Sequence, residues 1–338
     1  MTLRRALGSI GFRVRRAGRA VGREVATEVD RVRHRRRGAA DIALFHEFAP
    51  PPTGGGHQFL RALVAELERR GLIVELNRIS RGTPVCLFNS FNFDFRRLRR
   101  FARPNCRMVH RVDGPIGVYR GFDDGTDARI QKINRDLADA TVAQSRFSLE
   151  AHRELGIELT EPVVIGNAAD PAVFHPPAER EPVAGRKLRL VASSWSDNPN
   201  KGADVFRWLD SHLDTDRFEL TFVGRSAEPF TRIATVGPLA SGPLADELRR
   251  HDAYIAASRN DPCSNALVEA LACGLPALYR ASGGHPELVG DAGVPFTDPD
   301  ELAEALDRLA AELEQRRAAI RVTSLEDVAD RYLEVLRA

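Results

Sequence analysis

The chain has 338 residues, of which 43% are hydrophobic and 28% are charged. This length and composition are typical of a globular protein with two domains. No apolar run reaches the roughly 18 residues that a membrane-spanning helix needs, and residues 1–38 lack the continuous apolar segment of a secretory signal. The four cysteines, Cys86, Cys106, Cys263 and Cys273, form no C-x-x-C pair. We therefore expect a cytoplasmic protein without disulfides or a cysteine metal site.

Residues 1–38 form a basic extension that differs from the rest of the chain. They contain twelve arginines and three acidic residues, a net charge of +9 in a chain whose total is +2. Apolar residues recur there every three or four positions, which predicts an amphipathic helix lying on an anionic membrane surface. Four glycines each weaken such a helix by about 1 kcal/mol, so a disordered leader is the alternative. Only Phe12 lies among the arginines as an aromatic, which argues against nucleic-acid binding.

Strand and helix patterns alternate over residues 41–175. Short apolar runs typical of buried parallel strands occur at 42–45, 72–76, 85–88, 107–110, 140–143 and 163–165. Helical periodicity lies between them, at 57–70 and 128–137. This alternation predicts a parallel sheet covered by helices on both faces.

The same alternation returns over residues 186–324, after a polar, proline-containing linker at 176–185. The expected strands are 188–192, 218–223, 253–256 and 276–279, and the expected helices are 202–213, 243–250 and 265–273. A last helical pattern covers residues 325–338. The predicted fold is therefore α/β, with two doubly wound, Rossmann-like domains that face a cleft where ligands bind.

The segment from Asp261 to Pro276 is the most informative in the chain. Ser264 and Asn265 are good N-caps for a helix that Gly274 ends. The free N–H groups at this helix start, including that of Ala266, can hold an anion. Glu269 lies one turn further on, and its side chain leans back toward the same pocket. Amides for phosphate and carboxylates for ribose and sugar hydroxyls together predict a nucleotide-sugar site.

This segment resembles the E-x7-E signature of family-4 retaining glycosyltransferases, followed by their EA-x-A-x-G-x-P run. The chain differs at the first acid, which is Asp261 instead of Glu. The resemblance implies the two-lobed GT-B fold, with an acceptor domain at 41–175, a donor domain at 186–324 and a final helix that crosses back to the first domain.

The resemblance extends to a loop after the first strand of the second domain, from Ser193 to Gly202. It ends in Lys-Gly, and the family's lysine, here Lys201, neutralises the donor diphosphate. The family often has an arginine earlier in this loop, where Ser194 and Trp195 stand here. Arg225, after the strand-end residue Gly224, is the candidate that replaces it.

In the first domain, Thr53, Gly54, Gly55 and Gly56 resemble the family's glycine loop. Bare backbone there lets a phosphate and an acceptor approach closely. His110 and Asp113 lie where the fourth strand reaches the cleft, and we expect them to contact sugar or acceptor. The predicted catalytic residues are therefore His110, Asp113, Lys201 and Asp261.

The resemblance implies transfer of a sugar from a nucleoside diphosphate to an acceptor hydroxyl with retention of configuration. Lys201 and helix N-termini supply the positive charge for the leaving diphosphate, so we expect no cofactor and no metal. We interpret Asp214–Asp216 and Asp298–Asp300 as turn caps rather than as D-x-D metal sites. The acceptor is a glycan, a lipid-linked molecule of the cell envelope or another hydroxyl compound. An inactive nucleotide-sugar-binding or partner-binding protein, a sugar-nucleotide epimerase and a membrane-surface adaptor are the alternatives.

Overall fold

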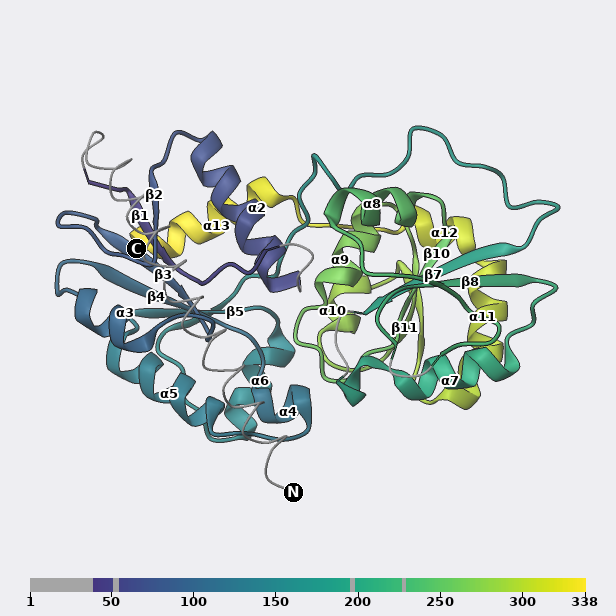
Figure 1. Ribbon diagram of the computed structural model, residues 1–338, viewed down its shortest axis with the longest axis horizontal. Coiled ribbons are helices and arrows are strands. Elements are labelled where there is room, and N and C mark those ends of the chain that lie inside the picture. The colour runs from purple at the N-terminus through teal and green to yellow at the C-terminus, as the bar shows by residue number, and fades with distance from the viewer. Residues whose placement is uncertain (1–38, 51–54, 195–197, 227–228) are drawn as a thin grey trace, which may run out of the picture.

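The computed structural model describes residues 39–50, 55–194, 198–226 and 229–338. The expectations for the basic extension 1–38, for Thr53 and Gly54, and for Trp195 fall outside these residues. The described chain forms two lobes side by side, each built on its own sheet (Figure 1). None of the described helices is long and apolar enough to cross a membrane.

The first lobe is a six-stranded sheet in the order β2-β1-β3-β4-β5-β6, with every pair parallel. Its elements are β1 (Ile42–Phe45), α2 (Gly55–Arg69), β2 (Val74–Leu76), β3 (Val85–Asn89), α3 (Phe95–Phe101), β4 (Arg107–Val112), α4 (Ile116–Arg120), α5 (Thr126–Leu137), β5 (Ala140–Ala143), α6 (Arg146–Glu154) and β6 (Pro162–Val164). The strand order reverses between β1 and β3, and a doubly wound sheet leaves a crevice at such a point.

The second lobe is also a six-stranded parallel sheet, in the order β12-β11-β10-β7-β8-β9. Its elements are β7 (Leu188–Ser194), η1 (Pro199–Lys201), α7 (Ala203–His212), β8 (Phe218–Gly224), β9 (Ala234–Val236), α8 (Ser241–Arg249), β10 (Ala253–Ala256), α9 (Asn265–Ala272), β11 (Ala277–Arg280), α10 (His285–Val289), β12 (Gly293–Phe296), η2 (Pro299–Glu301), α11 (Leu302–Ala311) and α12 (Leu313–Ala318). Here the reversal lies between β7 and β10. The predicted fold class, two doubly wound α/β domains, is confirmed.

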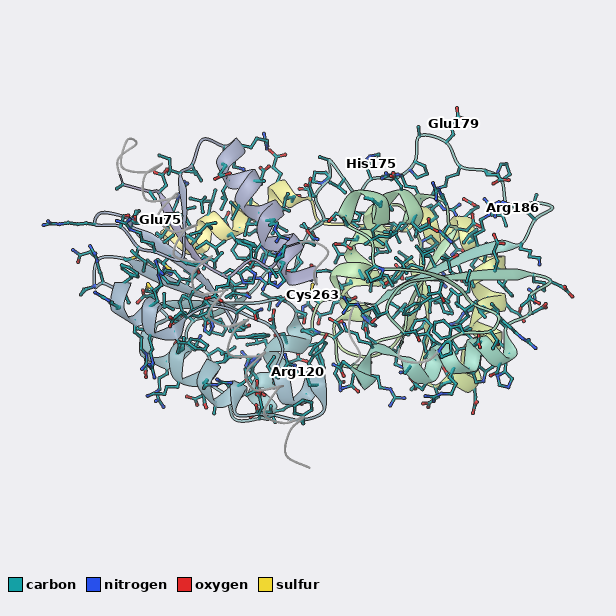
Figure 2. All side chains as sticks on the ribbon, in the orientation of Figure 1. Glu75, Arg120, His175, Glu179, Arg186 and Cys263 are labelled. Atoms are coloured by element: carbon teal, nitrogen blue, oxygen red, sulfur yellow. The ribbon has the colours of Figure 1, made fainter. Side chains whose placement is uncertain are left out.

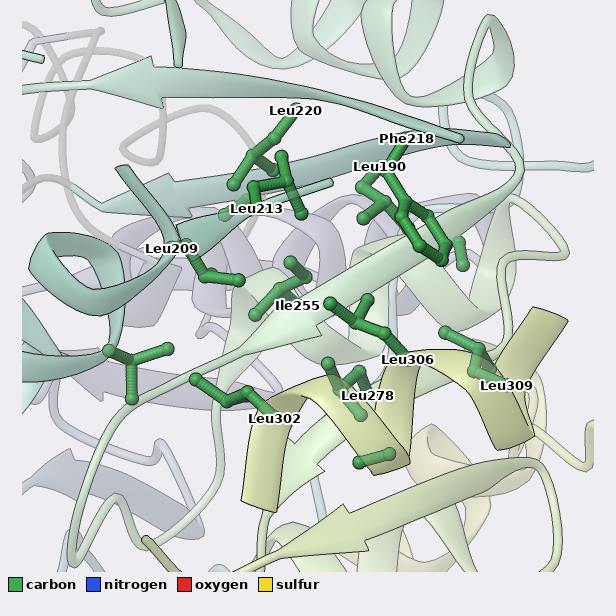
Figure 3. Close-up of a cluster of buried hydrophobic side chains, with 14 of the residues drawn as sticks. Leu190, Leu209, Leu213, Phe218, Leu220, Ile255, Leu278, Leu302, Leu306 and Leu309 are labelled. Atoms are coloured by element: carbon green, nitrogen blue, oxygen red, sulfur yellow. The ribbon is translucent and has the colours of Figure 1, made fainter. Parts of the chain in front are cut away.

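Hydrophobic burial holds each sheet to its helices. In the second lobe, leucines of α11 pack onto Leu190, Phe218, Ile255 and Leu278 of the sheet (Figure 3). Burial of each such side chain stabilises the fold by about 1.5–3 kcal/mol. The strands are almost wholly apolar because helices cover both of their faces.

The last helix, α13 (Leu325–Arg337), follows the second lobe in sequence but packs on the first. Ser324 caps its start by accepting a hydrogen bond from the N–H of Asp327 at 2.9 Å. Val328 and Tyr332 then join the core formed by α2 and the first sheet. Figure 1 shows α13, in yellow, crossing to the first lobe. This crossing connects the two lobes a second time.

Candidate functional site

A cavity of about 350 Å³ lies between the two lobes and is lined by residues of both. It opens at the carboxyl ends of β1, β3 and β4 in the first lobe and of β7 and β10 in the second. Cys263, on a loop that lines it, lies where the lobes meet (Figure 2). Ten of the predicted site residues line this cavity: Gly55, Gly56, Asp113, Ser193, Lys201, Asp261, Ser264, Asn265, Ala266 and Glu269.

The start of α9 lines the cavity, and no described residue accepts a hydrogen bond from the N–H groups of Asn265 and Ala266. Ser264 is its N-cap and accepts a hydrogen bond from the N–H of Leu267 at 3.4 Å. The start of α2 meets it there, since a Cβ on Gly55 would lie 2.3 Å from the Cβ of Asn265. Only glycine allows this approach. Two helix N-termini therefore lie together at one end of the cavity, which favours a bound anion.

Lys201 forms an ion pair with Asp261 inside the cavity. Its Nζ lies 2.7 Å from Oδ2 of Asp261 and 5.0 Å from the ring centre of Tyr119, which α4 contributes from the opposite lobe. Burial alone would lower the pKa of Lys201, but Asp261 and Tyr119 raise it above its usual value. Burial likewise opposes ionisation of Asp261, yet the nearby Lys201 lowers the pKa of this carboxyl overall. The pair is thus ionised, with the ammonium facing the cavity.

Gly202 sets the position of Lys201. Its φ of +87° is in the left-handed region, and a Cβ there would lie 2.3 Å from the Cβ of Ala257. Only glycine meets both conditions without strain. The Lys-Gly pair of the predicted loop is therefore a structural unit, in which the glycine turns the chain from η1 into α7 and fixes the lysine at the cavity.

Glu269 is a buried carboxyl without a partner among the described residues. Its side chain lines the cavity from the second turn of α9, and the residue is 8% exposed. Burial raises its pKa to about 8. A carboxyl in this state can satisfy its oxygens by accepting hydrogen bonds from a ligand with two neighbouring hydroxyls, such as a ribose.

Asp113 belongs to a polar network that ties the first sheet to α9. It accepts hydrogen bonds from Arg111 at 3.3 Å and from Gln144. Arg111 also donates to Asn167 at 2.9 Å, and Asn167 donates to Asn265 at 3.1 Å. The chain of contacts thus runs from the core of the first lobe to the first residue of α9.

Three predicted residues do not line the cavity. His110 lies within β4, which is two residues longer than expected, and its ring is fully buried between Phe88 and Asn134. Gly224 is buried at the end of β8, where a Cβ would lie 1.9 Å from the carbonyl oxygen of Ser194. Arg225 follows it and is exposed. These positions do not support the ligand contacts that we expected for His110, Gly224 and Arg225.

Sequence reasoning missed much of the first-lobe wall of the cavity, including four polar or aromatic side chains. His46 follows β1, Asn89 ends β3, His57 lies near the start of α2, and Tyr119 lies on α4. Polar residues directly after buried strands were the available signal for His46 and Asn89. No cluster of three or more His, Cys, Asp or Glu within the described ranges is arranged to hold a metal ion. The Asp214–Asp216 segment forms a turn, with Asp216 N–H bonded to Asp214 at 3.1 Å.

Residues 189–312 match the family model of Glycosyl transferases group 1. The matched region runs from β7 to the end of α11 in the second lobe. It contains Lys201, Asp261, the start of α9 and Glu269. No curated protein matches the chain in sequence. The family match supports sugar transfer.

Solved structures of low sequence identity share the fold over both lobes. Sucrose-phosphate synthase of Thermosynechococcus elongatus superposes with a TM-score of 0.68 at 17% identity, over 88% of this chain and 98% of its own. The catalytic domain of Arabidopsis thaliana starch synthase IV, bound to ADP and acarbose, gives 0.64 at 12%, over 88% and 99%. Anabaena HepE in complex with UDP-glucose gives 0.59 at 16%, over 87% and 95%. The chain therefore has the GT-B fold of these proteins.

Proposed function

We propose that this protein is a retaining, metal-independent glycosyltransferase that moves a sugar from a nucleoside-diphosphate sugar to an acceptor hydroxyl. The observation that carries the proposal is the convergence of Lys201, the start of α9 and the unpartnered Glu269 on one cavity. These groups supply a cation, backbone donors and a diol acceptor, which are the three needs of a bound nucleotide sugar.

In the proposed reaction the diphosphate leaves as the glycosidic bond breaks, so negative charge grows on its oxygens. Lys201 and the N–H groups at the start of α9 stabilise that charge. Both are already in place, which lowers the reorganisation that the transition state requires. Glu269 binds the ribose hydroxyls, and Asp261 holds Lys201 and meets the sugar. The acceptor oxygen bonds to the sugar on the face that the diphosphate leaves, and the hydroxyl proton passes to the departing phosphate oxygen, so the anomeric configuration is retained.

The names of two structural neighbours agree with such a donor. HepE is described with UDP-glucose and starch synthase IV with ADP. The resemblance of Asp261 and Glu269 to the paired acids of family-4 enzymes supports retention. Charge compensation by Lys201 supports a reaction that needs no metal.

The test is binding of UDP-, GDP-, ADP- and dTDP-sugars in the presence of EDTA. We expect one nucleotide to bind, and Lys201→Ala to weaken it by about 10- to 100-fold, because a hydrogen bond to a charged group contributes about 1.5–3 kcal/mol. Lys187→Ala is the matched control, since Lys187 is exposed and does not line the cavity. Binding that occurs without EDTA and is lost when EDTA is added would refute metal independence but leave the donor site intact.

The same experiment separates the alternatives. If the wild type binds no nucleotide sugar, with or without EDTA, a nonenzymatic, partner-binding role becomes the better hypothesis. If it binds one and releases an epimer or free sugar without an acceptor, it is an epimerase. The anomeric configuration of a transferred sugar, measured by NMR of the product, decides between retention and inversion.

The basic extension adds a proposal about location. Its charge suits an anionic membrane surface at the inner face of the cell membrane, where a lipid-linked or envelope glycan would be the acceptor. Co-sedimentation of the full chain with anionic and neutral vesicles tests this, compared with a chain that begins at residue 39. Equal binding by both chains would refute a role for the extension.

A further inference from the structure

Two histidines form a pair on the first-lobe wall of the cavity. His46 follows β1, and His57 lies on the first turn of α2. Nε2 of His46 lies 2.8 Å from Nδ1 of His57. Both rings line the cavity, and no described residue is hydrogen-bonded to Nε2 of His57. The ring of His57 therefore has one bound nitrogen and one available nitrogen.

A chain of hydrogen bonds fixes which nitrogens carry protons. Arg111 donates to Oδ1 of Asn89 at 2.7 Å, and a guanidinium can only donate. This contact turns the other end of the amide, Nδ2, toward Nδ1 of His46 at 3.3 Å. Because Nδ2 is a donor, Nδ1 of His46 must accept.

The proton position on His46 determines the proton position on His57. His46 accepts at Nδ1, so its proton lies on Nε2, which donates to Nδ1 of His57. His57 thus accepts at Nδ1 and carries its own proton on Nε2. Burial is the main cause that lowers the pKa of His46, to about 3, and it also lowers the pKa of His57. Both rings are therefore neutral at pH 7, and His57 offers a single N–H donor.

Asp113 supplies the matching acceptor. Its carboxylate lines the same cavity and is 29% exposed. One of its oxygens, Oδ1, accepts from Arg111 and Gln144, whereas no described residue donates to the other. A group that accepts from His57 and donates to Asp113 is a hydroxyl. A phosphate oxygen only accepts, and the carboxylate repels it.

We infer that His57 and Asp113 together bind a hydroxyl group of the acceptor molecule, with His57 as the donor and Asp113 as the acceptor of hydrogen bonds. Arg111, Asn89 and His46 are positioning residues that fix the proton of His57 on Nε2. The assignment of this hydroxyl to the acceptor rests on the proposed function, because the donor-binding groups come from the second lobe. The direction of the hydrogen-bond chain does not depend on that function.

The first experiment reads the tautomers directly. Long-range proton–nitrogen NMR of the full chain labelled with ¹⁵N-histidine, without ligand at pH 7, distinguishes a protonated Nε2 from a protonated Nδ1. Variants His46→Gln and His57→Gln assign the signals. We expect the Nε2–H form for both rings. An Nδ1–H form or an imidazolium at His57 would overturn the inference.

The second test reverses the direction of the hydrogen-bond chain. Asn89→Asp places a carboxylate oxygen next to Nδ1 of His46, which must then carry a proton. In that variant His46 accepts at Nε2, and the proton of His57 moves to Nδ1. The His46 signals of the folded variant show whether that ring is neutral; a neutral His46 with an unchanged Nε2–H signal at His57 would refute the role of the hydrogen-bond chain. The spectrum of the other histidines shows whether the variant is folded.

The third test asks what His57 binds. The probes are the methyl glycosides of glucose, mannose and galactose, and inorganic phosphate, each titrated into the protein with UDP present. We expect a glycoside to shift the Nε2 signal of His57, and His57→Ala to weaken that glycoside about tenfold, the effect of one hydrogen bond of about 1.4 kcal/mol. His57→Gln retains an N–H donor and should recover most of the affinity. His175→Ala, an exposed histidine outside the cavity (Figure 2), is the control.

Two outcomes contradict the inference. Either phosphate but no glycoside shifts the His57 signal, which would assign the residue to the diphosphate, or no probe shifts it at all. Failure of the proposed function has a different signature. In that case the wild type binds no nucleotide sugar in the donor panel, while the NMR signals of His46 and His57 still report the direction of the chain.

Discussion

Glu269 is expected to lower the stability of the empty protein as the pH rises. Burial raises its pKa from 4.5 to about 8, so between these values the folded state holds a proton that the unfolded state has lost. Stability therefore falls as the pH increases through this window. At about 1.4 kcal/mol for each pKa unit, the cost reaches about 3 kcal/mol at pH 7 and approaches about 5 kcal/mol above pH 8. These are upper limits, because water in the cavity can hydrate the carboxylate.

Glu269→Gln removes this cost, since its side chain stays neutral. Both tryptophans of the chain, Trp195 and Trp208, belong to the sequence of the second lobe, so their fluorescence follows unfolding of the lobe that contains Glu269. As the pH rises from 5.5 to 8.5, we expect the thermal midpoint of the wild type to decrease relative to that of the variant. Glu304→Gln, at an exposed position on α11, should follow the wild type.

The same variant should lose the nucleotide sugar. In the proposed complex the ribose donates hydrogen bonds to the ionised carboxylate, so binding should lower the pKa of Glu269 and should be stronger at higher pH. A nucleotide sugar is the suitable ligand because its diphosphate does not titrate in this range. Parallel thermal midpoints for wild type and Glu269→Gln across the pH range would refute the reasoning, as would tighter binding at pH 6 than at pH 8.

Three further predictions concern contacts that hold the site together. Asp261→Asn leaves the partly buried ammonium of Lys201 without its carboxylate and should destabilise the fold by up to about 3 kcal/mol in chemical unfolding. Asp246→Asn breaks an exposed pair with Arg249 and should cost under about 1 kcal/mol, and equal effects would contradict the burial argument. Glu287, on α10, accepts from the N–H groups of Arg146 and Phe147 across the lobes, at 2.9 and 2.8 Å. Glu287→Gln should therefore increase the radius of gyration in small-angle scattering, whereas Glu150→Gln, on the α6 helix that carries Arg146 and Phe147, should not. Gly224→Ala should destabilise by several kcal/mol, because its φ is +128° and its Cβ would meet Ser194; Gly237→Ala has open space and should be near neutral in thermal unfolding.

Local patterns predicted most of the fold. The strands at 140–143 and 253–256 have the bounds that their apolar runs indicate, because a buried parallel strand is apolar throughout. Short helices such as α3 and α4 were missed. The first of these is rich in arginine and depends on Asp94 as N-cap, so its hydrophobic periodicity is weak.

The sequence predicted more of the residues on the second-lobe wall of the cavity than on the first-lobe wall. Asp261, Ser264 and Glu269 lie within nine residues, on one loop and the helix that follows it, so their spacing alone predicts that they share a pocket. The strand before that loop also ends where expected. His110 was misplaced because β4 continues for two residues, and that extension moves the cavity edge from His110 to Asp113.

The first-lobe wall had no such local signal. His46, His57 and Asn89 come from three elements spread over more than forty residues, and only the order of the strands brings them together. The tautomer of His57 also depends on other residues, since Arg111 determines the position of its proton through Asn89 and His46. The identity of any one of these residues in the sequence does not indicate where the proton of His57 lies. The second-lobe wall of the cavity is therefore readable from a contiguous motif, whereas the first-lobe wall depends on contacts that exist only after the first sheet has formed.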